Sequence, residues 1–286
     1  MARIEIDGIG IEYELLGPAG APAIAVTPGG RMSKDAPGVR ELGEALARGG
    51  RRVLLHDRPN CGQSDLCFTG ETESMMQGEA LIGLIRTLNL GPTALAGGSA
   101  GSRTSLFAAA HDPEIVSHLL QWWISAGTIS LMSLGNSYCC EPAVAASYGG
   151  MEAVAGLPTF AEQIARNPRN REILLAQDVD EFVATMERWA GAFVPTEGSL
   201  VPGMTADRIA RLTMPALVFR GSARDIYHPD WTSERLDEML PNSRLVDPPW
   251  TEQEFLANWA EATRTGEGHL ALWPRLAEPI LAFTAS

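Results

Sequence analysis

The chain has 286 residues, of which 45% are hydrophobic and 20% are charged, and its formal net charge is −13. This composition can supply a large hydrophobic core and argues against wholesale disorder. A nucleic-acid binder would carry a basic footprint, and a strongly acidic chain is repelled by anionic membranes. We therefore expect neither nucleic acid nor a membrane as a partner.

The N-terminal segment MARIEIDGIG lacks the apolar core of a signal peptide, and no apolar run approaches the roughly 18 residues of a membrane span. The cysteines are Cys61, Cys67, Cys139 and Cys140. None has the C-x-x-C spacing of a zinc site, and the adjacent pair is poorly placed to form a disulfide. We expect four reduced thiols, no metal and a cytoplasmic protein.

The first half of the chain predicts strands that alternate with helices. Alternation around Asp7-Gly8 predicts an antiparallel hairpin, and the apolar run at 23–26 predicts a strand buried on both faces. The patterns that follow predict, in order, a helix at 38–50, a strand at 51–57, a helix at 74–91, a strand at 93–96, a helix at 102–111 and a strand at 115–125. Such alternation predicts a mostly parallel sheet with right-handed crossovers.

The alternation stops at residue 127 and returns near residue 213. Between them the patterns are mainly helical, and the helix at 178–194 spaces Phe182, Met186 and Trp189 along one face. The last part predicts a strand at 216–220, a helix at 231–240, a strand at 243–247, a helix at 251–266 and a helical segment at 270–286 that Pro279 interrupts. We therefore expect a sheet domain of residues 1–126 and 213–286 that carries a helical cap at 127–212.

Small residues surround Ser99 in the stretch Gly97-Gly98-Ser99-Ala100-Gly101. This stretch fits G-x-S-x-G between a strand and a helix, where a sharp turn lifts the serine above the sheet. Larger side chains at positions 97 and 101 would clash in such a turn. The alternative is a glycine-rich turn without chemistry.

A serine hydroxyl needs a base to become nucleophilic, and the base needs a carboxylate to orient it. The histidines after Ser99 are His111, His118, His228 and His269. In this strand–turn–helix setting the acid precedes the base along the chain, which favours Asp225 after a strand and His269 in a glycine-flanked loop. We predict a triad of Ser99, Asp225 and His269, with Asp247 or Glu267 as alternative orienting groups.

Several stretches carry a resemblance to a known family. HDRPNCGQSD at 56–65 is similar to a D-x-x-G-x-G-x-S turn, and LVFRGSARDIYHP is similar to an acid-loop segment. With the serine turn, they make the chain resemble the α/β-hydrolase superfamily over roughly residues 1–125 and 213–286. The resemblance implies the α/β-hydrolase fold, a mostly parallel sheet flanked by helices with a helical cap insertion.

The resemblance also implies an oxyanion hole. Its two donors would be the backbone N–H groups of Gly30 and Ala100. Two positions depart from the family pattern. Pro28 stands where many members have histidine, and Asn60 stands where glycine is usual, although asparagine tolerates left-handed backbone.

These features predict a serine hydrolase that works through an acyl-enzyme and needs no cofactor. We expect a small-molecule substrate, either a carboxylic ester, a lactone or a compound with a C–C bond next to a ketone. An aminopeptidase of the proline-iminopeptidase type and a non-catalytic ligand receptor are the alternatives. The oligomeric state stays open, with a homodimer as one arrangement.

Substrate contacts are predicted from cations and aromatic residues. Arg31 and Lys34 follow the oxyanion loop and could bind a substrate carboxylate, although solvated surface cations are the alternative. Trp123 and Trp189 could line an apolar substrate pocket between cap and sheet. For these aromatic residues the alternative is that they form the core of the cap itself.

Overall fold

A single eight-stranded sheet forms the centre of the computed structural model, which describes residues 2–196 and 200–285. The strand order is β1-β2-β4-β3-β5-β6-β7-β8. The strands are Ala2–Ile6 (β1), Ile9–Leu16 (β2), Ala23–Thr27 (β3), Arg52–His56 (β4), Thr93–Gly98 (β5), Val116–Trp122 (β6), Ala216–Phe219 (β7) and Ser243–Val246 (β8). Only the β1–β2 and β2–β4 pairs of these strands are antiparallel, which confirms the mostly parallel sheet.

Helices connect the strands and build the inserted segment. They are Val39–Arg48 (α1), Glu73–Thr87 (α2), Ala100–His111 (α3), Thr128–Gly135 (α4), Glu141–Ala155 (α5), Pro158–Arg166 (α6), Arg169–Leu175 (α7), Val179–Ala192 (α8), Ala206–Ala210 (α9), Asp230–Met239 (α10), Glu252–Thr265 (α11) and Ala277–Phe283 (α12). Short 3₁₀ turns cover Pro113–Ile115 (η1) and Trp273–Leu276 (η3), and a π-helical turn covers Asn136–Cys140 (η2).

Local sequence explains several of these boundaries. Asp7 and Gly8 both have positive φ, as a tight hairpin turn between β1 and β2 requires. The Thr72 hydroxyl caps the N-terminus of α2 by accepting a hydrogen bond from the backbone of Met75. Pro279 does not interrupt the last helix as expected, because it lies in the first turn of α12, where no intrahelical N–H is lost.

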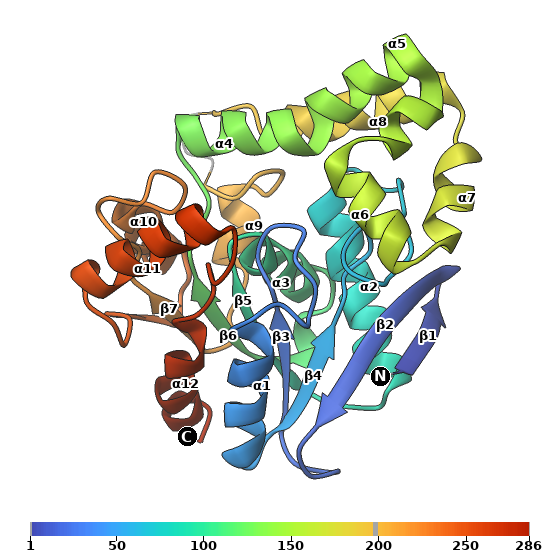
Figure 1. Ribbon diagram of the computed structural model, residues 1–286. Coiled ribbons are helices and arrows are strands. Elements are labelled where there is room, and N and C mark those ends of the chain that lie inside the picture. Colours follow the sequence, from blue (N-terminus) through green and yellow to red (C-terminus); the bar gives the residue numbers. More distant parts are fainter. Residues whose placement is uncertain (1, 197–199, 286) are drawn as a thin grey trace.

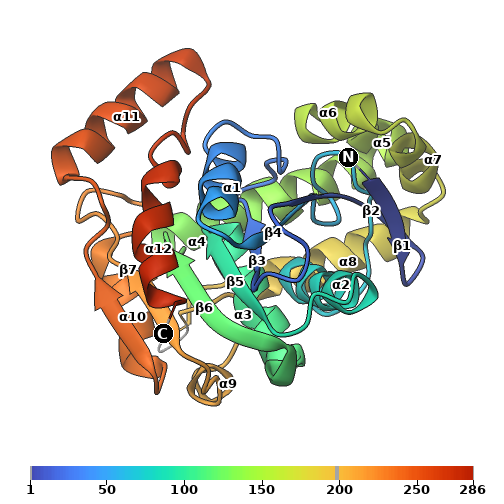
Figure 2. The ribbon, with the colours of Figure 1, turned by 90° about the horizontal axis from the view of Figure 1, so that it is seen from below.

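Helices cover both faces of the sheet, as Figures 1 and 2 show. On one face α1, α11 and α12 bury residues such as Leu42, Phe255 and Ile280 against the strands. On the other face α2, α3 and α10 bury a second cluster that includes Leu81 and Leu106. The strands between these layers are buried on both sides, because the apolar runs of the parallel strands have no solvent-facing side.

The helices α4 to α8 lie above the sheet in Figure 1 and come from the segment between β6 and β7. They bury a third cluster around Phe160, Phe182 and Trp189, which Leu66 of the sheet domain completes. Toward the end of the inserted segment, Leu200 and Ile209 belong to the cluster under α3 instead. The segment is therefore helical through α8, and its end packs onto the sheet domain.

Among the described helices none is long and apolar enough to cross a membrane. All four cysteines are free thiols, two of them buried. Burial raises the pKa of Cys61 to about 11 and that of Cys139 to about 12, so both stay protonated at neutral pH.

Candidate active site

Ser99 sits on a sharp turn between β5 and α3. Its φ of 57° is unusual for a residue other than glycine and marks a strained backbone. A Cβ at position 97 would lie 2.3 Å from the Gly101 carbonyl oxygen, and one at position 101 would lie 2.1 Å from the Thr27 carbonyl oxygen. The small residues are therefore required by the close approach of neighbouring backbone.

The structure joins Ser99 to Asp225 through His228. The Oγ of Ser99 lies 2.9 Å from Nε2 of His228, and Nδ1 of the same ring lies 2.9 Å from Oδ2 of Asp225. Both the imidazole and the carboxylate are more than nine-tenths buried. A hydroxyl, an imidazole and a carboxylate in this order form the geometry of a nucleophile, a base and an orienting acid.

A tight turn after β7 creates the contact between the acid and the base. The Oδ1 atom of Asp225 accepts hydrogen bonds from the backbone N–H groups of Tyr227, at 2.8 Å, and His228, at 3.1 Å. Burial alone would raise the pKa of Asp225, but the hydrogen bond and charge of His228 and the two backbone donors outweigh it. The pKa of Asp225 therefore lies below its ordinary value, and the carboxylate is ionised at neutral pH.

The structure contradicts the expectation that His269 stands between Ser99 and Asp225. Both ring nitrogens of His228 already contact these two residues. The ring of His269 instead meets Trp259 edge to face, 5.2 Å between centroids. Its loop follows the long helix α11 and is held beside α1, where the Leu270 carbonyl comes so close to Gly38 that no Cβ would fit there.

A local signal for His228 exists in the sequence. Asp225 and His228 are three residues apart in a turn directly after a buried strand, so the carboxylate can reach the ring of the same turn. The alternative orienting groups lie elsewhere. Asp247 is exposed and accepts a hydrogen bond from Arg220 at 3.0 Å, and Glu267 is an exposed loop residue.

A second hydroxyl touches the Ser99 oxygen. Ser125 follows β6, is buried, and its Oγ lies 3.2 Å from Oγ of Ser99. The backbone N–H of Ser99 donates to the carbonyls of Trp122 and Trp123 at the end of the same strand. The end of β6 therefore holds both the backbone and the hydroxyl of Ser99.

The loop after β3 lies against the serine turn. A Cβ on Gly29 would lie 3.1 Å from Cβ of Ser99, and Gly30 has a φ of 50°. The guanidinium of Arg58 donates to the carbonyl of Gly30 at 2.6 Å and more weakly to that of Gly29 at 3.4 Å. Asn60, which stands where glycine is usual, does adopt the left-handed backbone, with a φ of 66°.

A cavity of about 210 Å³ opens onto Ser99 and His228. The side chains of Met32, Trp123, Leu134, Tyr138, Tyr227, Trp259, His269 and Leu270 complete its wall together with Gly29 and Gly30. The wall is mainly apolar, and none of its residues is an aspartate or a glutamate. Such a cavity suits a small, largely apolar molecule with few polar groups.

Of the four predicted substrate contacts, only Trp123 lies on this cavity. Its indole stacks on the His228 ring, 5.6 Å between centroids at 19°. Trp189 is buried among the inserted helices and donates to the Gly70 carbonyl at 3.1 Å, so it belongs to the core of that segment. Arg31 is also absent from the wall, because it pairs with Glu73 at 3.1 Å.

Lys34 is not a solvated surface cation either. Its side chain is buried, and its Nζ lies 2.6 Å from Oδ2 of Asp35. Its backbone N–H donates to Asp57 at 2.6 Å. Lys34 therefore helps to fix the loop after β3 and does not line the cavity at Ser99.

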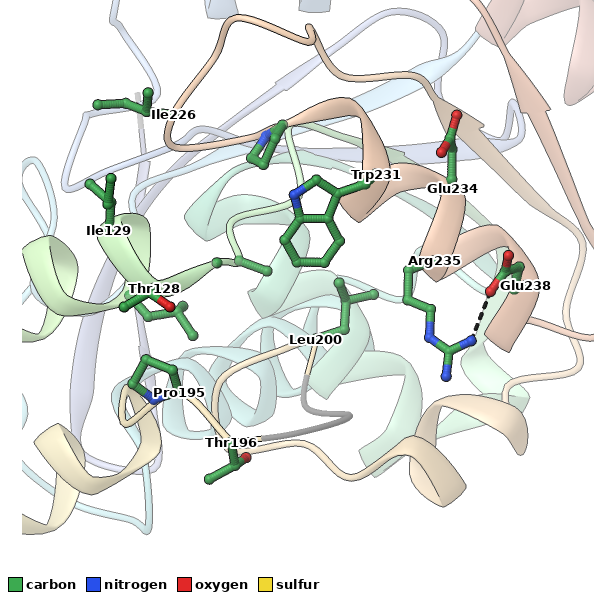
Figure 3. Close-up of a pocket in the computed structure, with 14 residues that line it drawn as sticks. Thr128, Ile129, Pro195, Thr196, Leu200, Ile226, Trp231, Glu234, Arg235 and Glu238 are labelled. Atoms are coloured by element: carbon green, nitrogen blue, oxygen red, sulfur yellow. Dashed lines mark hydrogen bonds and ion pairs between the residues drawn. The ribbon is translucent and has the colours of Figure 1, made fainter.

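Figure 3 shows a larger cavity, of about 850 Å³, between α4 and α10. Ile226 and Pro229 face it, whereas Tyr227 and His228, which lie between them in the chain, face the Ser99 cavity. Trp231 projects into it. Neither Ser99 nor His228 lines this cavity, so the two cavities flank the Asp225–His228 turn and only the smaller one contains the reactive groups.

Within the described residues, no group of three or more histidine, cysteine, aspartate or glutamate side chains is placed to hold a metal ion.

No protein-family model matches the chain, and no curated protein matches it in sequence. Solved structures do match. An enol-lactonase from Burkholderia xenovorans LB400 is 19% identical over 100% of both chains, with a TM-score of 0.60. Est816, an N-acyl homoserine lactone degrading enzyme, is 19% identical over 97% of this chain and 96% of its own, with a TM-score of 0.57.

A thermophilic esterase from Thermogutta terrifontis is also 19% identical, over 93% of this chain and 99% of its own, with a TM-score of 0.55. At this level of identity the likeness establishes the fold and leaves the activity to be argued from the site. The matches span almost the whole chain, including the inserted helices. The chain therefore has the α/β-hydrolase fold.

Proposed function

We propose that the protein is a serine hydrolase of small carboxylic esters or lactones, with Ser99 as nucleophile, His228 as general base and Asp225 as the orienting acid. One observation carries the proposal, namely the continuous contact from Ser99 Oγ through the His228 ring to the Asp225 carboxylate, at 2.9 Å on each side. This contact opens onto a mainly apolar cavity. A base that contacts the serine and a carboxylate that contacts the base together make a serine hydroxyl nucleophilic at neutral pH.

The reaction follows from this geometry. Ser99 Oγ forms a bond to the carbonyl carbon while its proton passes to Nε2 of His228, and Asp225 holds the Nδ1–H of the resulting imidazolium. The carbonyl oxygen becomes an oxyanion, for which we assign the backbone N–H groups of Gly30 and Ala100 as donors. His228 then returns the proton to the leaving alkoxide as its bond to carbon breaks.

Water completes the cycle. It gives a proton to His228 and forms a bond to the acyl carbon, and the carboxylic acid leaves as Ser99 recovers its proton. With a lactone the leaving hydroxyl stays attached to the acyl group, so the product is a hydroxy acid. Every proton in the cycle moves between substrate, water, Ser99 and His228, and the cycle uses no cofactor.

Two features favour oxygen esters among the reactions that such a triad performs. The matching solved structures include an enol-lactonase, a lactone degrading enzyme and an esterase. The cavity wall carries no aspartate or glutamate among the described residues, so it offers no carboxylate to a free amine. Aminopeptidase activity therefore has no support from the site, and C–C bond cleavage stays a prediction from the sequence.

A fluorophosphonate probe combined with a panel of substrates tests the proposal. The panel contains 4-nitrophenyl esters of increasing chain length, lactones and a vinylogous diketone. We expect the probe to label the wild type and not Ser99→Ala, and we expect short esters or lactones to be hydrolysed. Ser99→Ala should lose about 10⁴-fold or more in turnover. Labelling that persists in folded Ser99→Ala contradicts the proposal, and a wild type that is neither labelled nor active indicates a ligand receptor.

A further inference from the structure

Arg103 is a buried cation close to the nucleophile that the proposed reaction does not use. It lies four residues after Ser99, one turn along α3, and is 3% exposed. Its Nε and Nη1 atoms are buried and have no hydrogen-bond partner. A buried guanidinium with unused donors is costly, because the lost hydration is not replaced. The structure therefore leaves two strong donors near the active site without an acceptor.

Two more buried arginines lie in the same region. Arg58 donates to backbone carbonyls of the loop after β3 and to the Gln77 side chain, and its Nε has no partner. Arg31 pairs with Glu73, which also accepts a hydrogen bond from an asparagine amide. Among the described residues, Arg58 and Glu73 are the ionised side chains that act on Arg103. Among the described residues, the carboxylate that forms an ion pair with one of these three arginines is that of Glu73, so Arg103 has no carboxylate partner of its own.

The nearby carboxylate of Asp57 does not supply this partner. Its two oxygens accept hydrogen bonds from the backbone N–H groups of Lys34, at 2.6 Å, and Gln63, at 2.8 Å. The thiols of Cys61 and Cys139 are neutral at neutral pH, as their raised pKa values of about 11 and about 12 show. The charge that acts on Asp57 is that of Lys34, and the carboxylate that acts on Arg103 is that of Glu73.

Tyr138 connects the arginines to the cavity at Ser99. It lines that cavity, and its hydroxyl hydrogen-bonds the Arg103 side chain. Its ring lies 5.1 Å from the guanidinium carbon of Arg31 and packs edge to face against Phe193, over which Arg103 also lies. Tyr138 belongs to the π-helical turn η2, a rare geometry that is frequent at functional sites.

We propose that the substrate of the Ser99 site carries a carboxylate, and that Arg103 and the Tyr138 hydroxyl bind this carboxylate at the end of the cavity formed by the inserted helices. The carboxylate accepts hydrogen bonds from the unused guanidinium donors and from the tyrosine hydroxyl, so it supplies the acceptor that Arg103 lacks. This inference rests on the proposed hydrolase function and narrows it to esters or lactones of dicarboxylic acids.

The test compares two esters that differ in one charge. They are 4-nitrophenyl hydrogen glutarate, which keeps a free carboxylate, and its methyl ester. We expect the wild type to prefer the acid by about 10- to 100-fold in kcat/KM, as a charge-assisted hydrogen bond predicts. In Arg103→Met this ratio should fall to about one, mainly through a higher KM for the acid. Tyr138→Phe should lower the ratio by roughly three- to tenfold.

Arg208→Met is the matched control. Arg208 also lies 5.6 Å above a phenylalanine ring, that of Phe107, but the arginines whose charges act on Tyr138 are Arg103, Arg31 and Arg58. The ratio should be unchanged in this variant. If Arg103→Met does not fold, as judged by thermal unfolding, Tyr138→Phe and Arg103→Lys decide the question. A second measurement needs no variant, since glutarate should slow fluorophosphonate labelling of the wild type at concentrations where its dimethyl ester does not.

The outcomes separate this inference from the proposed function. Labelling and ester hydrolysis without a preference for the acid overturn the carboxylate subsite and leave the hydrolase proposal standing. A preference that persists in folded Arg103→Met and in Tyr138→Phe also overturns it. Failure of both labelling and hydrolysis overturns the hydrolase proposal, and the inference falls with it. A preference lost in Arg103→Met and kept in Arg208→Met supports the subsite.

Discussion

The two ends of the active-site cavity differ in how well their polar groups are paired. At the sheet end, Ser99, His228 and Asp225 contact one another in sequence, and the carboxylate receives two further backbone hydrogen bonds. At the other end, behind Tyr138, Arg103 keeps two buried donors without an acceptor. The sheet end is thus complete without a ligand, whereas the arginine end is incomplete.

This difference follows from what each end has to do. A nucleophile and its base must be held in place before the substrate arrives, because their geometry sets the reaction rate. A group that recognises a charged substrate is instead satisfied only when the substrate is present. The backbone also differs between the two ends. The strained turn at Ser99 is fixed by β3, β5 and β6, whereas Tyr138 lies in a π-helical turn of the inserted segment.

A change at the sheet end should have the largest effect on activity. Asp225→Asn removes the charge that stabilises the imidazolium of His228, so kcat/KM for a neutral 4-nitrophenyl ester should fall by about 10²- to 10⁴-fold. Asp247→Asn is the matched control, because Asp247 is an exposed carboxylate that pairs with Arg220. A folded Asp225→Asn protein with near wild-type activity would remove Asp225 from the mechanism.

The arginine end should be sensitive to loss of the Glu73 carboxylate. Glu73→Gln leaves the buried Arg31 without its partner and should lower the free energy of unfolding by about 3 kcal/mol. Glu162→Gln, which removes half of an exposed pair with Arg166, should cost less than about 0.5 kcal/mol. Denaturant titration measures both. An equal decrease in the free energy of unfolding in the two variants would show that the buried arginines do not depend on the Glu73 carboxylate.

Much of the fold could be predicted from the sequence, whereas the prediction of His269 as the base was wrong. The glycines around Ser99 and the apolar strands follow from local sterics and burial, which act between near neighbours. The position of His269 depends on how the loop after α11 packs beside Gly38, and that contact spans most of the chain. The turn joining Asp225 to His228 is local, and its spacing could have indicated the base.

Arg31 and Trp189 do not line the cavity for a related reason. Arg31 and Trp189 have the residue types expected of a binding pocket, but each has a partner elsewhere in the fold, Glu73 and the Gly70 carbonyl. Residue type alone does not reveal whether a cation is already paired. Arg103 gives no signal in the sequence, because only the three-dimensional structure shows that its donors lack acceptors.

A smaller effect on activity is expected at Ser125, whose hydroxyl contacts the Ser99 oxygen at the sheet end. Ser125→Ala removes the contact to Ser99 Oγ and should lower kcat by about tenfold or less with little change in KM, because the base and acid stay in place. Ser130→Ala is the control, since Ser130 is buried and its hydroxyl has no partner. Unchanged kcat in Ser125→Ala would show that β6 positions Ser99 through its backbone alone.

The smallest effect concerns stability in acid. Because the pKa of Asp225 is lower in the folded protein than its ordinary value of 3.8, the carboxylate stabilises the fold above about pH 3.8. This contribution is lost as the pH falls below that value. The free energy of unfolding of the wild type should therefore fall more steeply below about pH 4 than that of Asp225→Asn, by at most about 1.4 kcal/mol per pH unit. Parallel curves from denaturant titration across this range would contradict the ionic pairing.

The central claim is that His228, and not His269, activates Ser99. The most direct test is the rate of fluorophosphonate labelling and of ester hydrolysis in His228→Gln and His269→Gln, with thermal unfolding to verify folding. We predict that His228→Gln loses about 10⁴-fold or more, whereas His269→Gln stays within about tenfold of the wild type. The reverse result, with activity retained in His228→Gln and lost in His269→Gln, would contradict the account.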